Sequence, residues 1–440
     1  MRQPKSLIYL VPALAIALAT TPCFGDSQAR IVRLSDVEGN VLIDRNGGQG
    51  YEKAILNLPI TQGVKLKAGD TGRAELEMED GSTVRIIPDT VVEIPQLSLR
   101  DSGAKVSSIR LLEGTAYFNF AGTKDDEFSI TFVREKIALT HAAHLRVSVG
   151  DTDATVGVFK GDVEVDGPSS KVEISKNHKA TFDLIDDDKY KLARDFEEEP
   201  FDSWDKQQDQ YRDRYASSAY SGYSPYTYGT SDLNYYGSFS DVPGYGMMWQ
   251  PYFAGAGWDP FMNGAWAFAP GFGYGWVSAY PWGWTPYHYG SWAYVPMYGW
   301  MWQPGGAWMG FDAIPVILGA PASYAAPHSP LLPGPRIVPV NNGPTTMPIG
   351  NSPTRVQIPN NSAGLGVPRG SLENLAELSQ TAQQKGYVSA RLHTVTVSGF
   401  GWGGGYGGSS TRHFGVAGAA SSHASAEHSS SGHSGSSGHK

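Results

Sequence analysis

From residue 31 to about residue 190, apolar and polar residues alternate with a period of two, which is typical of strands with one buried face. Ala74, Leu76 and Met78 are expected to point into a core. The charged residues of the same run are expected to face water: Arg73, Glu75, Glu77 and Glu79. Asp80-Gly81 follows and predicts a hairpin, because this pair tolerates the positive φ of tight β-turns.

Further short runs of the same kind follow, and turn residues separate nearly all of them. They are Ala116-Phe118-Phe120, Ile130-Phe132, Leu145-Val147-Val149, Val163-Val165, Val172-Ile174 and Phe182-Leu184. Many short strands without a long helical pattern predict a mainly β domain, built as a sandwich, a roll or a solenoid-like stack. Residues 196–217 differ, because they predict one short polar linker helix with Ser or Asp at its N-cap.

Residues 233–310 are rich in Trp, Tyr and Gly and repeat every 26 to 27 residues. Each copy has Gly-x-aromatic, then Pro, an aromatic residue and Trp at fixed offsets. The copies are Gly237, Phe239, Pro243, Tyr245 and Trp249; Gly264, Trp266, Pro270, Phe272 and Trp276; and Gly290, Trp292, Pro296, Tyr298 and Trp302. Because Gly and Pro recur too often for a helix, the repeats predict small two-stranded units stacked through their aromatic rings.

Two interpretations of these rings make different demands. Rings at invariant positions of the repeat, such as Trp276 and Trp302, are expected to form the core of a domain that has few aliphatic residues. Less regular rings could instead form an exposed platform that stacks on sugars, as in glycan-binding modules. The candidate glycan-stacking residues are Trp282, Trp284 and Trp300.

The C-terminal third is expected to contain little regular structure. Residues 311–369 are rich in Pro and predict an extended connector. Residues 370–397 predict a short helix, capped by Ser371 and ending before Gly386, followed by a strand. Residues 398–440 consist mainly of Gly, Ser, Ala and His, and predict a disordered tail.

The N-terminus has the pattern of a secretory signal peptide, with basic Arg2 and Lys5 before an apolar stretch. Cleavage is expected after residue 25 or residue 29, and either cut removes Cys23, the one cysteine. A lipoprotein anchored through Cys23 is disfavoured, because Thr20-Thr21-Pro22 is a poor lipobox. We therefore expect an exported protein, periplasmic or associated with the cell envelope, with no transmembrane span after signal removal.

Charge and motifs narrow the chemistry further. The net charge of −9 argues against nucleic acid as a partner. No esterase elbow, zinc-protease helix or P-loop occurs, so we expect no enzyme, no catalytic or cofactor-binding residue and no cofactor. His141 and His144 are not expected to bind a metal, because three residues apart on a strand they point to opposite faces.

The first domain resembles the FecR domain, named for a periplasmic iron-signalling regulator. The matching pieces are Gly39-Asn40-Val41, Leu66 to Asp70, Ala74-Glu75-Leu76 with Asp80-Gly81-Ser82, Leu112 to Ala116 and Gly161 to Val165. The resemblance implies a non-catalytic, exported β domain. Regulatory members of the family pass a signal to a cytoplasmic σ factor through a transmembrane helix, which we do not find in this sequence. The combination with a linker helix and an aromatic tract resembles a group of exported bacterial proteins.

Three hypotheses follow. The first is a non-enzymatic envelope protein with a structural or binding role, whose partner is an envelope protein or a polysaccharide. The second is a sensory accessory of a FecR-type regulatory system, with transduction performed by another protein. The third and least favoured is a glycan-active enzyme, which would need two carboxylates at a defined separation.

Overall fold

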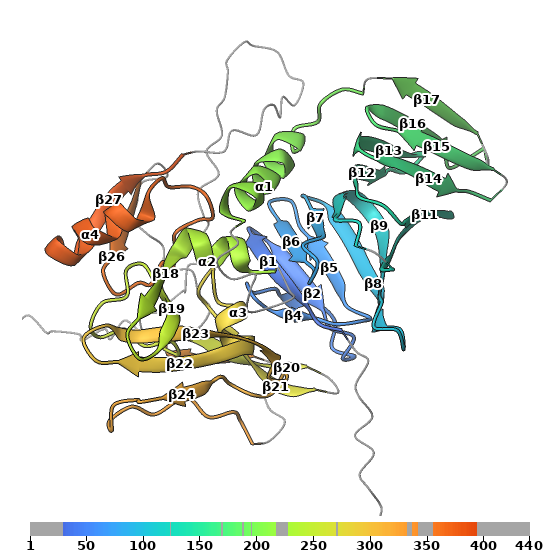
Figure 1. Ribbon diagram of the computed structural model, residues 1–440. Coiled ribbons are helices and arrows are strands. Elements are labelled where there is room, and N and C mark those ends of the chain that lie inside the picture. Colours follow the sequence, from blue (N-terminus) through green and yellow to red (C-terminus); the bar gives the residue numbers. More distant parts are fainter. Residues whose placement is uncertain are drawn as a thin grey trace, which may run out of the picture.

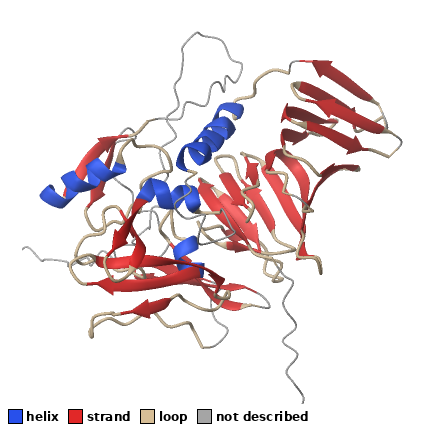
Figure 2. Ribbon diagram, in the orientation of Figure 1, coloured by secondary structure: helices blue, strands red, loops and turns tan. Residues whose placement is uncertain are grey.

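The computed structural model describes residues 30–123, 125–168, 170–186, 189–194, 196–216, 228–269, 272–331, 337–341 and 355–393. Strands dominate these residues (Figure 2), so the expected mainly β fold is confirmed. The expected signal peptide and the Gly/Ser/His-rich tail lie outside the described residues. Within the described ranges, no helix has the length and apolar character needed to cross a bilayer.

The N-terminal domain consists of two sheets that share one long strand, β9 (Lys105–Phe120). The first sheet has the order β3 (Glu52–Lys53), β2 (Val41–Asp44), β5 (Lys65–Ala68), β8 (Thr90–Leu99), β9, β10 (Glu127–Phe132), β11 (Glu135–Leu139), β14 (Asp162–Asp166) and β15 (Lys171–Ser175). The second has the order β4 (Pro59–Ile60), β1 (Val32–Glu38), β6 (Arg73–Glu77), β7 (Thr83–Ile86), β9, β12 (Ala143–Val149), β13 (Asp153–Lys160), β16 (His178–Asp183) and β17 (Tyr190–Arg194). The pairing of β9 with β10 is parallel and the other pairings of these strands are antiparallel.

Strand β9 changes sheets at Gly114. Its residues up to Glu113 pair with β8 in the first sheet, and those from Gly114 onward pair with β12 in the second. Gly114 has a φ of +81°, and a Cβ at this position would lie 2.3 Å from the carbonyl oxygen of Asp89. Only glycine allows this close approach. The apolar residues between the sheets form one core that includes Leu76, Phe118 and Val147.

The alternation in β6 is confirmed for its apolar face and wrong for its charged face. Ala74, Leu76 and Met78 are buried in the core. Glu75, Glu77 and Glu79 are also buried, with exposed fractions of 0%, 3% and 8%, although they were expected to face water. For Glu75 and Glu77 the reason is that helices α1 (Asp202–Tyr215) and α2 (Thr230–Tyr236) lie against this side of the sheet (Figure 1). Glu79 is instead bound by Arg30, which lies 2.6 Å from its carboxylate.

The linker helix forms, but its N-terminus differs from the prediction. Phe201 occupies the N-cap, and it makes no side-chain cap hydrogen bond. Asp202, which was expected to be available for capping, is instead held by the guanidinium group of Arg146 at 2.6 Å and by the hydroxyl of Tyr117 at 2.8 Å. Contact with the sheet therefore overrides the local capping preference.

Each aromatic repeat is a β-hairpin, as the predicted two-stranded units require. The hairpins are β18 (Gly237–Val242) with β19 (Gly246–Pro251), β20 (Asn263–Ala269) with β21 (Gly273–Ser278), and β22 (Tyr289–Val295) with β23 (Gly299–Trp308). The first and third share a sheet with β24 (Val316–Leu318), and the second pairs with β25 (Ile337–Asn341). The first aromatic residue of each repeat faces its last Trp across the hairpin: Phe239 and Trp249, Trp266 and Trp276, Trp292 and Trp302.

The glycine of each repeat is explained by the last Trp of that repeat and by a backbone carbonyl oxygen across the hairpin, which a Cβ would approach to between 2.2 and 2.7 Å. A Cβ on Gly237 or Gly264 would lie 2.4 Å from the indole ring of Trp249 or Trp276, and a Cβ on Gly290 would lie 2.9 Å from the Nε1 of Trp302. Any larger residue would displace the ring from the backbone it covers.

The C-terminal third contains more structure than expected. Residues 311–369 were predicted to be an extended connector, yet β24 and β25 join the aromatic sheets, and β26 (Arg355–Pro359) pairs with β27 (Tyr387–Arg391). Helix α4 (Leu375–Lys385) ends at Gly386 as predicted, but Asn374 caps it instead of Ser371. The side chain of Asn374 accepts a hydrogen bond from the amide of Glu377, which places the helix start three residues later than expected.

Candidate functional site

The most distinctive site is a cluster of buried ions on the outer face of the second sheet. At its centre, the carboxylate of Glu75 on β6 is fully buried. Arg85 of β7 lies 2.8 Å from it, Arg212 of α1 lies 2.5 Å from it, and Arg369, just before α4, lies 2.8 Å from it. Glu75 is thus bound by guanidinium groups from three separate parts of the chain.

Asp232 of α2 makes a second junction in the same cluster. The guanidinium groups of Arg33 on β1 and of Arg369 lie 2.6 Å and 3.0 Å from its carboxylate. The hydroxyl of Tyr211 on α1 donates a hydrogen bond to it at 2.9 Å. Arg33 also lies 3.1 Å from Glu77 and donates to the carbonyl oxygen of Pro281. These contacts join the N-terminal domain to the aromatic domain.

The neighbouring side chains decide whether the carboxylates of Glu75 and Asp232 are charged. Burial alone would raise the pKa of Glu75, but Arg212, Arg85 and Arg369 outweigh it and hold that pKa well below its usual range. Burial is likewise the largest influence on Asp232, and Arg369 and Arg33 reverse it to lower the pKa. Both carboxylates are therefore ionised near neutral pH, as buried charges with several hydrogen-bonded partners can be.

Asp36 on β1 lies at the edge of this cluster and behaves in the opposite way. Burial, followed by the nearby carboxylate of Glu38, raises its pKa from 3.8 to about 7, although Arg369 acts against the shift. Asp36 therefore gains and loses a proton in a pH range where Glu75 and Asp232 stay charged.

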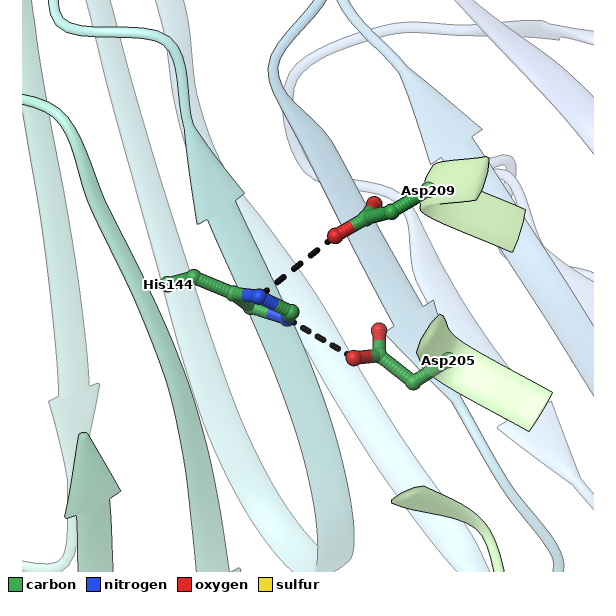
Figure 3. Close-up of side chains that lie close together, drawn as sticks. All are labelled: His144, Asp205 and Asp209. Atoms are coloured by element: carbon green, nitrogen blue, oxygen red, sulfur yellow. Dashed lines mark ion pairs between the residues drawn. The ribbon is translucent and has the colours of Figure 1, made fainter. Parts of the chain in front are cut away.

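A second group of side chains holds α1 on the sheet. Its members are His144 of β12 and Asp205 and Asp209 of α1 (Figure 3). The Nε2 of His144 lies 2.7 Å from Oδ2 of Asp205, and its Nδ1 lies 3.4 Å from Oδ2 of Asp209. The other oxygen of each aspartate is bound by Arg85, at 2.6 Å and 2.7 Å.

We tested whether this group fits a metal ion. The three donor groups approach within 4.8 Å of one another, which is the range of a metal site. Zinc ligands bonded at about 2.0–2.1 Å in a tetrahedron, however, lie about 3.3 Å from one another. The 2.7 Å between His144 and Asp205 is shorter, and the two carboxylates face different ring nitrogens. The arrangement is that of ion pairs.

The two histidines singled out in the sequence do not share a strand as expected, because His141 lies in a bend before β12 begins at Ala143. His141 is exposed and contacts the hydroxyl of Thr140, while His144 is half-buried under α1. The sequence interpretation missed that His144 meets Asp205 and Asp209. A signal for it exists, because Asp202, Asp205 and Asp209 share one face of α1 and follow strands whose outer faces carry basic residues.

The three candidate glycan-stacking residues lie in the core of the aromatic domain. Trp282 and Trp284 have an exposed fraction of 0% and Trp300 of 5%. Trp282 stacks on Tyr280 with ring centroids 4.9 Å apart, and its indole N–H donates to the carbonyl oxygen of Ala363. The expected exposed platform is therefore not formed by these rings.

The neighbours of the other two rings account for their burial. Trp284 contacts His288, and Trp300 contacts Tyr324. Trp282 and Trp284 lie just before the short helix α3 (Thr285–His288). Trp276 and Trp302 are buried, as expected for invariant positions of the repeat.

Comparison with known proteins assigns two segments of the chain. Residues 64–164 match the family described as FecR protein, and residues 230–314 match the family of unknown function DUF6600. Two crystal structures of a candidate anti-sigma factor from Parabacteroides distasonis ATCC 8503 are similar to 32% of this chain, at 19% and 18% identity and a TM-score of 0.28 each. The chain spans 63% of the length of those chains. No curated protein matches the chain.

The matched segments coincide with the two β-rich parts of the fold. The FecR match begins at the start of β5 and ends within β14, and the DUF6600 match begins at α2 and includes all three aromatic hairpins. The resemblance to FecR drawn from the sequence is thereby confirmed. The chain contains a FecR domain and, after the linker helix, a domain of the DUF6600 family.

Proposed function

We propose that this protein is a regulatory accessory of the FecR type, which acts by binding another protein and does not catalyse a reaction. The observation that carries the proposal is the FecR match over residues 64–164. In keeping with the leader pattern at residues 1–25, we propose that it is exported and works in the cell envelope. The signal would pass onward through a separate membrane protein.

The burial of the aromatic rings favours this role over glycan binding. Trp282, Trp284 and Trp300 contact other rings and offer little surface on which a sugar could stack. The aromatic domain is better described as a support for the FecR domain, because Arg33 binds both Asp232 and the carbonyl oxygen of Pro281. A partner that binds one domain would therefore also affect the other.

The two outer faces of the FecR domain suggest where a partner binds. The outer face of the second sheet is covered by α1 and α2 and is used within the chain. The outer face of the first sheet remains exposed and carries Leu112 among charges of both signs, including Lys67, Lys136 and the ion pair of Arg110 with Glu93. Leu112 is 43% exposed in the middle of β9. An exposed apolar side chain among charged ones suits a protein surface with an apolar centre and a charged rim.

The proposal can be tested by photo-crosslinking in native cells. A crosslinking amino acid at position 112 or 67 is expected to capture one protein of defined mass. The same amino acid in place of Tyr387, an exposed residue of β27, is the matched control and is expected to capture none. Failure of positions 67 and 112 to capture any protein, together with retention of the protein on purified cell-wall polysaccharide, would contradict the proposal.

A further inference from the structure

His144 lies between two carboxylates, and each of its ring nitrogens faces one of them (Figure 3). A neutral imidazole carries one N–H, so its other nitrogen would present a lone pair to an anionic oxygen. Only the imidazolium has an N–H on both nitrogens and a positive charge that can pair with Asp205 and Asp209. We propose that His144 is a proton-operated latch, which holds the linker helix on the FecR domain when protonated and loosens it when neutral.

The charges around the ring support this assignment. Asp205 and Asp209 face it from α1, and they share the guanidinium group of Arg85 on β7 with Glu75. Three carboxylates therefore meet one guanidinium group there, and a proton on His144 adds a positive charge beside Asp205 and Asp209. Neutral His144 would leave one carboxylate charge uncompensated in a partly buried site.

The side chains that other elements place near the imidazole ring of His144 do not supply the missing positive charge. Asn119, the partner of His144 on β9, donates a neutral hydrogen bond to Asp209 at 3.0 Å. Lys160, its partner on β13, is exposed. Arg146 on β12 is already bound to Asp202 and Glu199. The ring of Phe159 lies 5.1 Å from the imidazole and carries no charge.

His144 controls only part of the contact between α1 and the sheet. Trp204 of α1 is buried against Tyr117 and Ile87, and Arg146 holds Asp202, whatever the state of His144. Loss of the proton removes two ion pairs from the middle of α1. Because the two ion pairs need the protonated ring, we expect α1 to be held more tightly under acidic conditions than under alkaline ones.

Hydrogen exchange in the full-length protein tests the latch. Exchange of the amides of α1 is measured at about pH 5.5 and about pH 8 and corrected for the intrinsic pH dependence of exchange. In the wild type, the corrected exchange of α1 is expected to rise several-fold at the higher pH. His144→Gln, which cannot become charged, is expected to show the faster exchange at both pH values.

A matched control variant and a measurement with added Zn²⁺ complete the experiment. His141→Gln removes an exposed histidine three residues away and is expected to keep the wild-type response. An equal pH response of α1 in the wild type and in His144→Gln would overturn the proposal. So would protection of α1 at about pH 8 that appears on adding Zn²⁺ and is removed by EDTA, because that result would assign the group to a metal.

Discussion

Nη1 of Arg369 lies 2.8 Å from Oε1 of Glu75, a residue 294 positions earlier in the chain. This ion pair joins the segment before α4 to the second sheet of the FecR domain. The same guanidinium group binds Asp232 of the DUF6600 domain at 3.0 Å. Residues expected to form a linear series of modules with an extended connector are therefore joined through a shared cluster of buried charges.

The first prediction concerns Arg369. Arg369→Ala removes a partner of two buried carboxylates and is expected to lower the free energy of unfolding by about 3–5 kcal/mol, as when one member of a buried ion pair is deleted. Arg355→Ala, at an exposed position of β26, is the matched control and is expected to change it by less than about 0.5 kcal/mol. Denaturant unfolding of both variants measures the difference, and equal stability would contradict the assigned role of Arg369.

A second prediction concerns pH. The pKa of Asp36 is raised from 3.8 to about 7 in the folded protein, mainly by burial. The folded state thus keeps a proton that the unfolded chain releases, so this contribution to stability is complete below about pH 4 and is lost as the pH rises through about 7.

Asp36→Asn is accordingly expected to flatten the decline in stability between about pH 4 and about pH 7. Asp70→Asn, at an exposed position between β5 and β6, is expected to leave the decline unchanged. Thermal melts over this pH range provide the measurement. A decline of the same size in Asp36→Asn and in the wild type would show that Asp36 is not the group responsible.

The third prediction concerns the aromatic core. Trp302 pairs with Trp292 and Trp249, and its indole N–H donates to the carbonyl oxygen of Tyr289. Trp302→Ala and Trp276→Ala are each expected to cost about 3–5 kcal/mol of stability, as large-to-small core changes do. Tyr298→Ala, at an exposed hairpin turn, is expected to cost far less. Unchanged melting of both Trp variants would contradict their assignment to the core.

A fourth prediction follows from the repeat glycines. Gly264→Ala would place a Cβ 2.4 Å from the ring of Trp276 and 2.7 Å from the carbonyl oxygen of Val277, so it is expected to destabilise the DUF6600 domain strongly. Gly257→Ala has nothing within 4 Å of its Cβ and serves as the control. Near-UV circular dichroism, which reports on Trp packing, should change for Gly264→Ala alone.

The sequence predicts the hairpins and the end of α4 well, because residues close together in the chain determine them. The hairpin at Asp80-Gly81 and the three aromatic hairpins follow from turn residues and spacing, and Gly386 ends α4 through its positive φ. The burial of Trp276 and Trp302 follows from their invariant place in the repeat. These features depend on neighbours within one hairpin or one helix.

Features that depend on distant contacts were not predictable in the same way. Glu75 and Glu77 alternate with core residues, and a pattern of period two cannot distinguish water from a covering helix on the second face. The partners that bury them, Arg212 and Arg369, lie more than a hundred residues away. Trp282 and Trp284 were assigned to an exposed platform because they are irregular in the repeat, yet their loop folds into the core.

Gene expression in native cells tests the central claim, that this protein is a FecR-type regulatory accessory, most directly. Transcripts of a strain lacking the gene are compared with those of the parent and of the strain complemented with the wild-type gene. The account predicts that a narrow set of transcripts changes and is restored by complementation. An unchanged set of transcripts in the deletion strain, under conditions in which the parent makes the protein, would contradict it.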